Sequence, residues 1–223
     1  RQMCIRDSNV SHAAVWLLEK STPEQHNEYK DTGGPPLPDW MFEDNNECTH
    51  GAELILICVK PQIVKKVCQA LTSTKGQLVI SIAAGITTKA LSDWLPREQS
   101  IIRCMPNTPA LIRQGITGLY ANEYSTPEQK ENTEQLLGSV GNTLWVTEEN
   151  KLDVITAISG SGPAYFFYLM EQMIIAGIEL GITENEALEL TLQTALGAAR
   201  LANSCLLYTS PSPRDATLSR VPA

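Results

Sequence analysis

The sequence has 223 residues, of which 43% are hydrophobic, and it carries a formal net charge of −8 with an isoelectric point near 4.9. This apolar content is enough to bury a core, which excludes a largely disordered chain. An acidic surface repels phosphate backbones, which argues against nucleic-acid binding, and no stretch reaches the ~20 uninterrupted apolar residues of a membrane span.

The two ends of the chain differ in pattern from the middle. Residues 1–8 (RQMCIRDS) show no usable periodicity, and residues 205–223 hold three prolines and neither a helical nor a strand pattern. Both strings resemble translated adaptor sequence, so we expect a non-native or disordered leader and tail outside the fold. The alternative is a natural disordered tail. Residues 9–204 remain for the interpretation of the fold.

Short apolar runs alternate with helical patterns in residues 9–150. Strands are predicted at Ala14–Glu19, Leu54–Val59, Leu78–Ile82, Ile101–Met105, Ile116–Tyr120 and Thr143–Val146. Helices are predicted at Glu24–Lys30, Ile63–Leu71, Thr88–Leu95 and Pro127–Val140. The last of these helices starts with a capping box of Thr126 and Gln129. This alternation predicts an α/β fold with a Rossmann-like, doubly wound and mostly parallel sheet.

The strands stop after about Lys151, and residues 151–204 read as helices. They are predicted at Leu152–Ile158, Pro163–Leu180 and Glu184–Asn203. The last begins with a capping box of Thr183 and Glu186. The helix at 163–180 has almost no polar face and must be buried, although a domain of this size has little interior. A second subunit is the expected cover. The alternative, a membrane helix, is disfavoured by the two glutamates and the glutamine that interrupt it.

Six cysteines occur without a CxxC pair or the spacing of zinc ligands. We interpret them as free thiols in a reducing compartment. No signal-peptide pattern is present, and a cytoplasmic location is expected.

Three successive strand ends carry small or polar residues. They read Lys60-Pro61, Ala83-Ala84-Gly85 and Pro106-Asn107-Thr108-Pro109. A doubly wound sheet binds ligands at the carboxyl ends of its strands. Small residues there let a flat ring approach the backbone, a lysine can meet a phosphate or ribose oxygen, and an asparagine can bond a carboxamide. Each segment alone is typical of an ordinary loop, but three in succession predict a ligand site.

The motifs ICVKPQ (57–62), SIAAGIT (81–87), RCMPNTP (103–109) and SGSGPAYFF (159–167) resemble, in order and spacing, those of the pyrroline-5-carboxylate reductase family. The similarity covers roughly residues 43–204. It implies a Rossmann-type domain at 9–150 and an all-α dimerisation domain at 151–204, both incomplete. It also implies reduction of 1-pyrroline-5-carboxylate, a small cyclic imine, to L-proline by NADPH or NADH. The expected assembly is a homodimer or a higher homo-oligomer.

The resemblance also implies roles for individual residues, by position in these motifs. Val59, Lys60 and Pro61 would line the cofactor, Ala83, Ala84 and Gly85 would face the nicotinamide, and Asn107 would lie near the reacting ring. Asn45 matches a cofactor-contacting asparagine, and Thr22 lies where the family reads the adenosine ribose or its 2′-phosphate.

The SGSG segment has two interpretations. Gly160 and Gly162 can end one helix and start the next, with Pro163 in the first helical turn. Alternatively, the free N–H groups at Ser161 and Gly162 can hold the substrate carboxylate. The sequence leaves both open.

No catalytic acid is predicted. Hydride addition to a carbonyl needs a proton donor, but the three histidines lie outside the motifs and the helix Pro163–Ile182 contains no lysine or histidine. An imine can react as an iminium ion, so hydride transfer yields a neutral amine without a strong acid. Catalysis would then come mainly from holding the nicotinamide C4 within ~3–3.5 Å of the imine carbon.

Two segments of the family pattern are missing from the sequence. No GxGxxG-type turn occurs before Ala14, and no Ser/Thr- and Gly-rich loop follows the last helix. Three lost charge-assisted hydrogen bonds, at roughly 1.5–3 kcal/mol each, would weaken cofactor binding about a thousandfold. We therefore expect the chain as given to bind NADPH poorly and to be inactive, and micromolar binding in a titration would contradict this. A sheet without its first, central strand would also expose an edge.

Two alternative functions remain open from the sequence. One is another NAD(P)-dependent reductase of the same fold, acting on a hydroxy acid or a different imine. The other is a non-catalytic paralogue that senses the cofactor.

Overall fold

The computed structural model describes residues 3–7, 14–18, 41–42, 46, 49, 52–71 and 76–204. The chain divides into two compact units, Arg1–Pro163 and Ala164–Ala223. The sequence predicts a domain boundary at residue 150, directly before the helix that follows the last strand.

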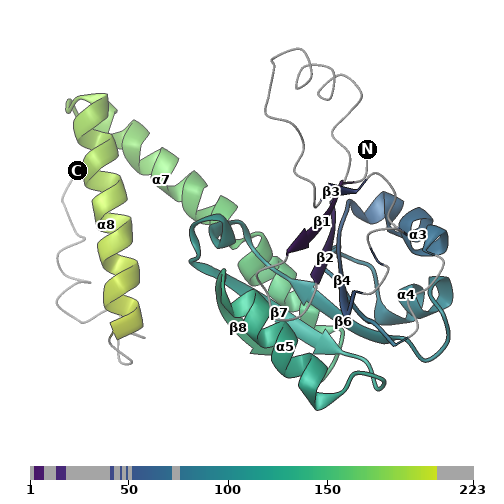
Figure 1. The fold of residues 1–223 in the computed structure, drawn as a ribbon. Helices are drawn as coiled ribbons and strands as arrows, with labels where there is room; N and C mark the ends of the chain where they lie inside the picture. The colour runs from purple at the N-terminus through teal and green to yellow at the C-terminus, as the bar shows by residue number, and fades with distance from the viewer. Residues whose placement is uncertain are drawn as a thin grey trace, which may run out of the picture. The chain divides into compact units, whose positions relative to one another are not determined.

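The first unit is built on one sheet (Figure 1). Its strands are β1 (Met3–Asp7), β2 (Ala14–Leu18), β3 (Met41–Phe42), β4 (Leu54–Cys58), β5 (Leu78–Ser81), β6 (Ser100–Met105), β7 (Gly115–Ala121) and β8 (Gly141–Trp145). They follow the order β3-β1-β2-β4-β5-β6-β7-β8. The pairs β2–β4, β4–β5, β5–β6 and β7–β8 are parallel, whereas β1–β2, β1–β3 and β6–β7 are antiparallel. The predicted Rossmann-like, mostly parallel sheet is confirmed.

The central strands are buried on both faces because their side chains alternate between two hydrophobic clusters. Ile55, Val79 and Ile101 belong to the cluster that includes residues of α3 (Pro61–Ala70) and α4 (Thr88–Trp94). Leu56 and Ile80 belong to the cluster that includes residues of α5 (Pro127–Gly138). Helices therefore cover both faces (Figure 1), and the uninterrupted apolar runs of the sequence are explained by this double burial.

The N-terminal part of the sheet differs from expectation. Met3–Asp7, which the sequence places outside the fold, pairs antiparallel with β2. A strand of five residues is too short to show a clear periodicity, so this pairing has no local signal in the sequence. The expected exposed edge of the sheet is also not found at β4, since β2 pairs in parallel with all five residues of that strand. The predicted helix Glu24–Lys30 lies outside the described residues.

The helix that follows β8 packs against the sheet. It consists of α6 (Lys151–Ile155), which continues directly into a π-helix, η2 (Thr156–Gly160). Leu152 is only 1% exposed, and a Cβ on Gly118 of β7 would lie 2.6 Å from Ile155 Cδ1. Because α6 packs this closely on the sheet, the predicted helix Leu152–Ile158 belongs to the first unit.

The second unit contains most of α7 (Gly162–Glu179) and α8 (Glu184–Ser204). The predicted capping box at the start of α8 is confirmed: Thr183 N–H donates to Glu186 Oε2 at 2.8 Å, and Glu186 N–H donates to Thr183 Oγ1 at 3.3 Å. The two helices meet at Gly177, where a Cβ would lie 3.1 Å from Ala187 Cβ.

Large apolar side chains of these two helices are exposed. They include Tyr165, Phe166, Phe167, Tyr168, Leu169, Met173, Ile175, Ile178, Leu188, Leu190, Leu192, Leu196 and Leu201. Exposed apolar side chains in such number on two helices are typical of an interaction surface. Within the part of the chain that the structure describes, no helix combines the length and hydropathy that a membrane crossing requires.

Candidate functional site

The three strand ends singled out in the sequence meet at one edge of the sheet. β4, β5 and β6 are neighbours and run parallel, with Ile57 opposite Ser81 and Ser81 opposite Arg103. Their carboxyl ends therefore lie side by side at the same level, and Ile82 N–H donates to the Ile57 carbonyl at 3.2 Å. The predicted convergence of the three ends is confirmed.

The predicted site residues on β4 and β5 differ in exposure. Val59 and Ala83 are buried, Pro61 is half-buried, and Lys60, Ala84 and Gly85 are exposed. Gly85 has a φ of +74°, a left-handed conformation that favours glycine, and no atom lies within 4 Å of the position of a Cβ. The end of β5 thus presents an open stretch of backbone. Asn45 and Thr22 lie outside the described residues.

Asn107 has a structural contact at the end of β6. Its side-chain Oδ1 accepts a hydrogen bond from Ile116 N–H at 2.9 Å, across the short 3-10 helix η1 (Thr108–Ile112). This bond ties the loop after β6 to the start of β7. The amide nitrogen of Asn107 is then the part of the side chain that can serve a ligand.

The SGSG segment lies against the same edge of the sheet. Ser161 N–H donates to the Thr156 carbonyl at 2.8 Å, which closes the last turn of the π-helix. A Cβ on Gly160 would lie 2.8 Å from Met105 Cε, so glycine allows this turn to rest on the last residue of β6. Gly160 ends one helix and Gly162 starts the next, which confirms the structural interpretation of the segment. A π-helix within a helical run often marks a functional position.

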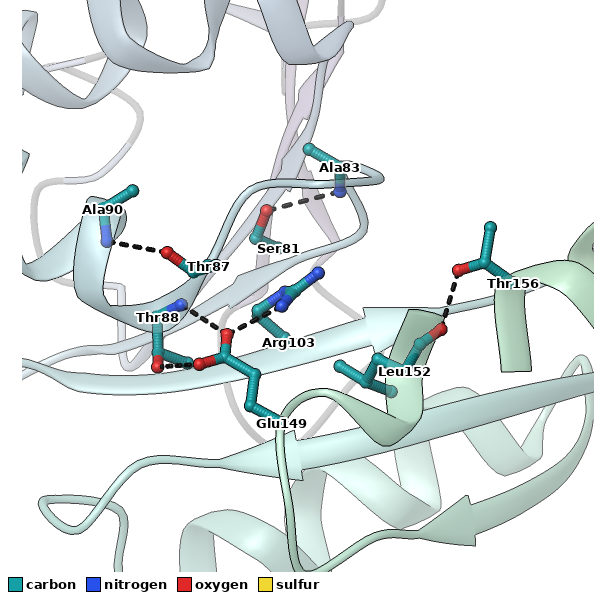
Figure 2. A network of polar contacts seen from close by, with 9 residues as sticks. All are labelled: Ser81, Ala83, Thr87, Thr88, Ala90, Arg103, Glu149, Leu152 and Thr156. Atoms are coloured by element: carbon teal, nitrogen blue, oxygen red, sulfur yellow. Dashed lines mark hydrogen bonds and ion pairs between the residues drawn. The ribbon is translucent and has the colours of Figure 1, made fainter. Parts of the chain in front are cut away.

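A polar network joins the start of α4, β6 and the loop that follows β8 (Figure 2). This network was not predicted from the sequence. Glu149, in the loop between β8 and α6, forms an ion pair with Arg103 of β6, with 2.7 Å between Oε1 and the guanidinium nitrogen Nη1. The Glu149 carboxylate also accepts hydrogen bonds from Thr88 N–H at 2.6 Å and from the Thr88 hydroxyl at 2.8 Å. Arg103, a charged residue inside an apolar strand, was the one signal of this network in the sequence.

The electrostatics of the network keep Glu149 ionised. Partial burial raises the pKa of its carboxyl, but the hydrogen bonds from Arg103 and from the N–H and hydroxyl of Thr88 outweigh this and hold the pKa below its ordinary value. The Arg103 side chain is 7% exposed, so its charge depends on Glu149 for compensation.

Cys58, Cys68 and Cys104 are free thiols, in agreement with the interpretation of the cysteines. Burial raises the pKa of Cys58 and of Cys68 to about 12. For Cys104, burial and the neighbouring Cys58 raise the pKa more than Arg103 lowers it. These protonated thiols are not nucleophiles at neutral pH.

Comparison with known families and structures gives matches along the chain. Residues 5–85 match the family model "NADP oxidoreductase coenzyme F420-dependent", and residues 149–219 match "Pyrroline-5-carboxylate reductase dimerisation". The first match begins inside the leader that we set apart, and the second continues into the tail at 205–223.

Solved structures match as well. A pyrroline-5-carboxylate reductase from Coxiella burnetii is 35% identical, with 91% of this chain and 78% of that chain covered and a TM-score of 0.73. The chain belongs to the pyrroline-5-carboxylate reductase family. Another member, the Plasmodium falciparum pyrroline carboxylate reductase with NADP bound, is 28% identical, with 82% and 68% covered and a TM-score of 0.71.

Curated relatives from bacteria carry the same family name. The pyrroline-5-carboxylate reductase of Pseudomonas aeruginosa is 51% identical over 166 residues, and that of Haemophilus influenzae is 44% identical over 161 residues. These stretches are 74% and 71% of this chain. The chain spans 61% and 59% of the lengths of these two reductases.

Proposed function

We propose that the protein containing this chain reduces 1-pyrroline-5-carboxylate to L-proline with NADPH. The observation that carries the proposal is the meeting of three strand ends and the SGSG turn at one edge of the sheet, with open backbone at Ala84 and Gly85. Membership of the family, and the NADP bound to the P. falciparum reductase, support the choice of substrate and cofactor. NADH is the second candidate cofactor.

The residues fit a nicotinamide dinucleotide. Gly85 carries no side chain and has free space around it, so a flat ring can lie close to the backbone at Ala83–Gly85. Val59, Lys60 and Pro61 would line the neighbouring part of the cofactor, and the Asn107 amide nitrogen would face the reacting ring. Asn45 and Thr22 remain proposed contacts to the cofactor, the latter at the adenosine ribose.

The SGSG segment would hold the substrate. The first N–H groups of an α-helix have no partner within the helix, and the helix dipole favours an anion there. The Ser161 N–H is already bonded to the Thr156 carbonyl, so the Ser161 hydroxyl and the backbone at Gly162, where the 18-residue helix α7 starts, would hold the carboxylate of the imine.

The mechanism requires positioning more than acid–base chemistry. NADPH supplies a hydride when it is bound. The side chains of this chain would orient the ring, exclude water from the strand ends, and hold the substrate carboxylate. If the substrate enters as an iminium ion, hydride transfer gives a neutral amine. The reaction then needs no proton donor, so the high pKa of the Cys58 thiol does not impair it.

The exposed apolar side chains of α7 and α8 support a homodimer or a higher homo-oligomer. The family model of dimerisation over residues 149–219 agrees with this proposal. We also propose a cytoplasmic location, which fits the free thiols of Cys58, Cys68 and Cys104.

The test uses the complete reading frame that contains this chain. The purified protein is incubated with pyrroline-5-carboxylate and NADPH, and loss of NADPH absorbance is compared with formation of L-proline. Matching rates are expected. Turnover of a hydroxy acid but not of this imine would instead favour a different reductase of the fold, and NADPH binding without turnover would favour a cofactor-sensing paralogue.

A substitution of Ala84 by leucine tests the cofactor loop. Ala84 is exposed, so the larger side chain should leave folding unchanged while it fills the space proposed for the nicotinamide. The Kd for NADPH is expected to rise at least about tenfold, equivalent to about 1.4 kcal/mol, in a fluorescence titration.

The matched control for this experiment is Ala70→Leu, the same change at an exposed position at the end of α3. It should leave the Kd for NADPH unchanged. Equal affinities of the wild-type protein and Ala84→Leu would rule out the proposed placement of the nicotinamide.

A further inference from the structure

The loop between β5 and α4, residues 82–87, is held at both of its ends. At its start, Ala83 N–H donates to the Ser81 hydroxyl at 3.3 Å. At its end, Thr87 caps α4 by accepting from Ala90 N–H at 3.1 Å, and Thr88 is bound by Glu149 (Figure 2). The apex, with Ala84 and Gly85, is exposed. The position of the apex therefore depends on these anchors.

Glu149 is the anchor that comes from elsewhere in the chain. It is separated by 61 residues from Thr88 and by 46 residues from Arg103. Its Oε1 accepts from both Thr88 N–H and Arg103, while its Oε2 accepts from the Thr88 hydroxyl. Both carboxylate oxygens thus accept hydrogen bonds, and one carboxylate joins the loop end to β6.

Glu149 also stands directly before the segment that carries Ser161. α6 begins two residues later, packs on β7 through Leu152 and Ile155, and runs into the π-helix that rests on Met105. The chain from Glu149 to Ser161 is therefore attached to the sheet along its length. A shift of Glu149 would change the position of the loop apex relative to Ser161.

We propose that Glu149 is a positioning residue that sets the distance between the cofactor loop at Ala83–Gly85 and the substrate segment at Ser161–Gly162. This inference rests on the proposed function. Hydride transfer depends steeply on the distance between donor and acceptor carbons, and a misplacement of about 1 Å can cost about a hundredfold in rate. A network that fixes this distance affects turnover more than affinity.

The test compares Glu149→Gln with Glu148→Gln in the complete protein. Glutamine has nearly the shape of glutamate but carries no charge, so it leaves the buried Arg103 guanidinium without its counter-ion even where its NH₂ group donates to the Thr88 hydroxyl. Glu148 is the exposed neighbour, paired with Lys151 at 2.9 Å, and is the matched control. We expect kcat to fall at least about tenfold in Glu149→Gln with less than about a threefold change in the KM for NADPH, and neither value to change in Glu148→Gln.

Hydrogen exchange on the same samples reports on the loop without reference to activity. Exchange at residues 82–90 should be faster in Glu149→Gln than in the wild type, and unchanged in Glu148→Gln. Thr88→Val, which removes one hydrogen bond and keeps the Arg103–Glu149 pair, should show smaller changes of the same kind. This second variant covers the case in which Glu149→Gln does not fold.

The outcomes separate the two proposals. Unchanged exchange at 82–90, or a kcat per folded molecule equal to that of the wild type, would overturn the role of Glu149. A wild-type protein that neither binds NADPH nor reduces the imine would overturn the proposed function, and exchange would then still decide whether Glu149 holds the loop.

Discussion

Replacing Phe166 by glutamate is expected to convert the proposed dimer into monomers. Phe166 is 66% exposed on α7 and is flanked by Tyr165, Phe167 and Tyr168, which are also more than half exposed. Truncation of a central aromatic residue at an interface typically costs about 2–4 kcal/mol, and an unpaired carboxylate in its place adds a desolvation penalty. A loss of about 3 kcal/mol weakens association more than a hundredfold. Sedimentation velocity at micromolar protein concentration measures the change.

The control for this substitution is Gln172→Glu, which adds the same charge at an exposed polar position of the same helix. It should remain dimeric, and far-ultraviolet circular dichroism should show equal helix content in both variants. A Phe166→Glu protein that sediments as the wild-type dimer would contradict the assignment of the exposed aromatic residues of α7 to the interface.

Much of the central sheet could be predicted from the sequence because its signals are local. The runs at β4, β5 and β6 are apolar throughout, since helices cover both faces of these strands. The capping boxes at Thr126 and Thr183 need only a partner three residues away. The meeting of the strand ends then follows from topology, since neighbouring parallel strands end at the same edge.

The parts that could not be predicted depend on contacts between distant segments. The antiparallel direction of β7 beside β6 is not visible in its own sequence. Glu148 and Glu149 are the same residue type in adjacent positions, yet one pairs with Lys151 on the surface and the other binds Arg103 and Thr88. Only the fold distinguishes them.

Replacing Gly141 by alanine is expected to destabilise the sheet unit strongly. Gly141 begins β8 directly opposite Gly115 of β7 and has a φ of +150°. A Cβ there would overlap the Gly115 carbonyl oxygen and would lie 2.6 Å from the Gly115 nitrogen. These are backbone atoms, so no change of rotamer can relieve the overlap. Strain and overpacking together should lower the free energy of unfolding by about 3 kcal/mol or more, as measured by urea titration.

Gly138→Ala is the matched control, since it adds the same methyl group three residues earlier. Gly138 is the last residue of α5 and has no atom within 4 Å of a Cβ position, so alanine should stabilise the protein by about 0.5–1 kcal/mol. Equal effects of the two substitutions would contradict the close Gly115–Gly141 contact. β8 ends at Trp145, shortly before Glu149, so loosening of β8 also releases the carboxylate that binds Thr88 and Arg103. Gly141→Ala should therefore increase hydrogen exchange at residues 82–90, although Gly141 lies in β8, far from that segment in the sequence.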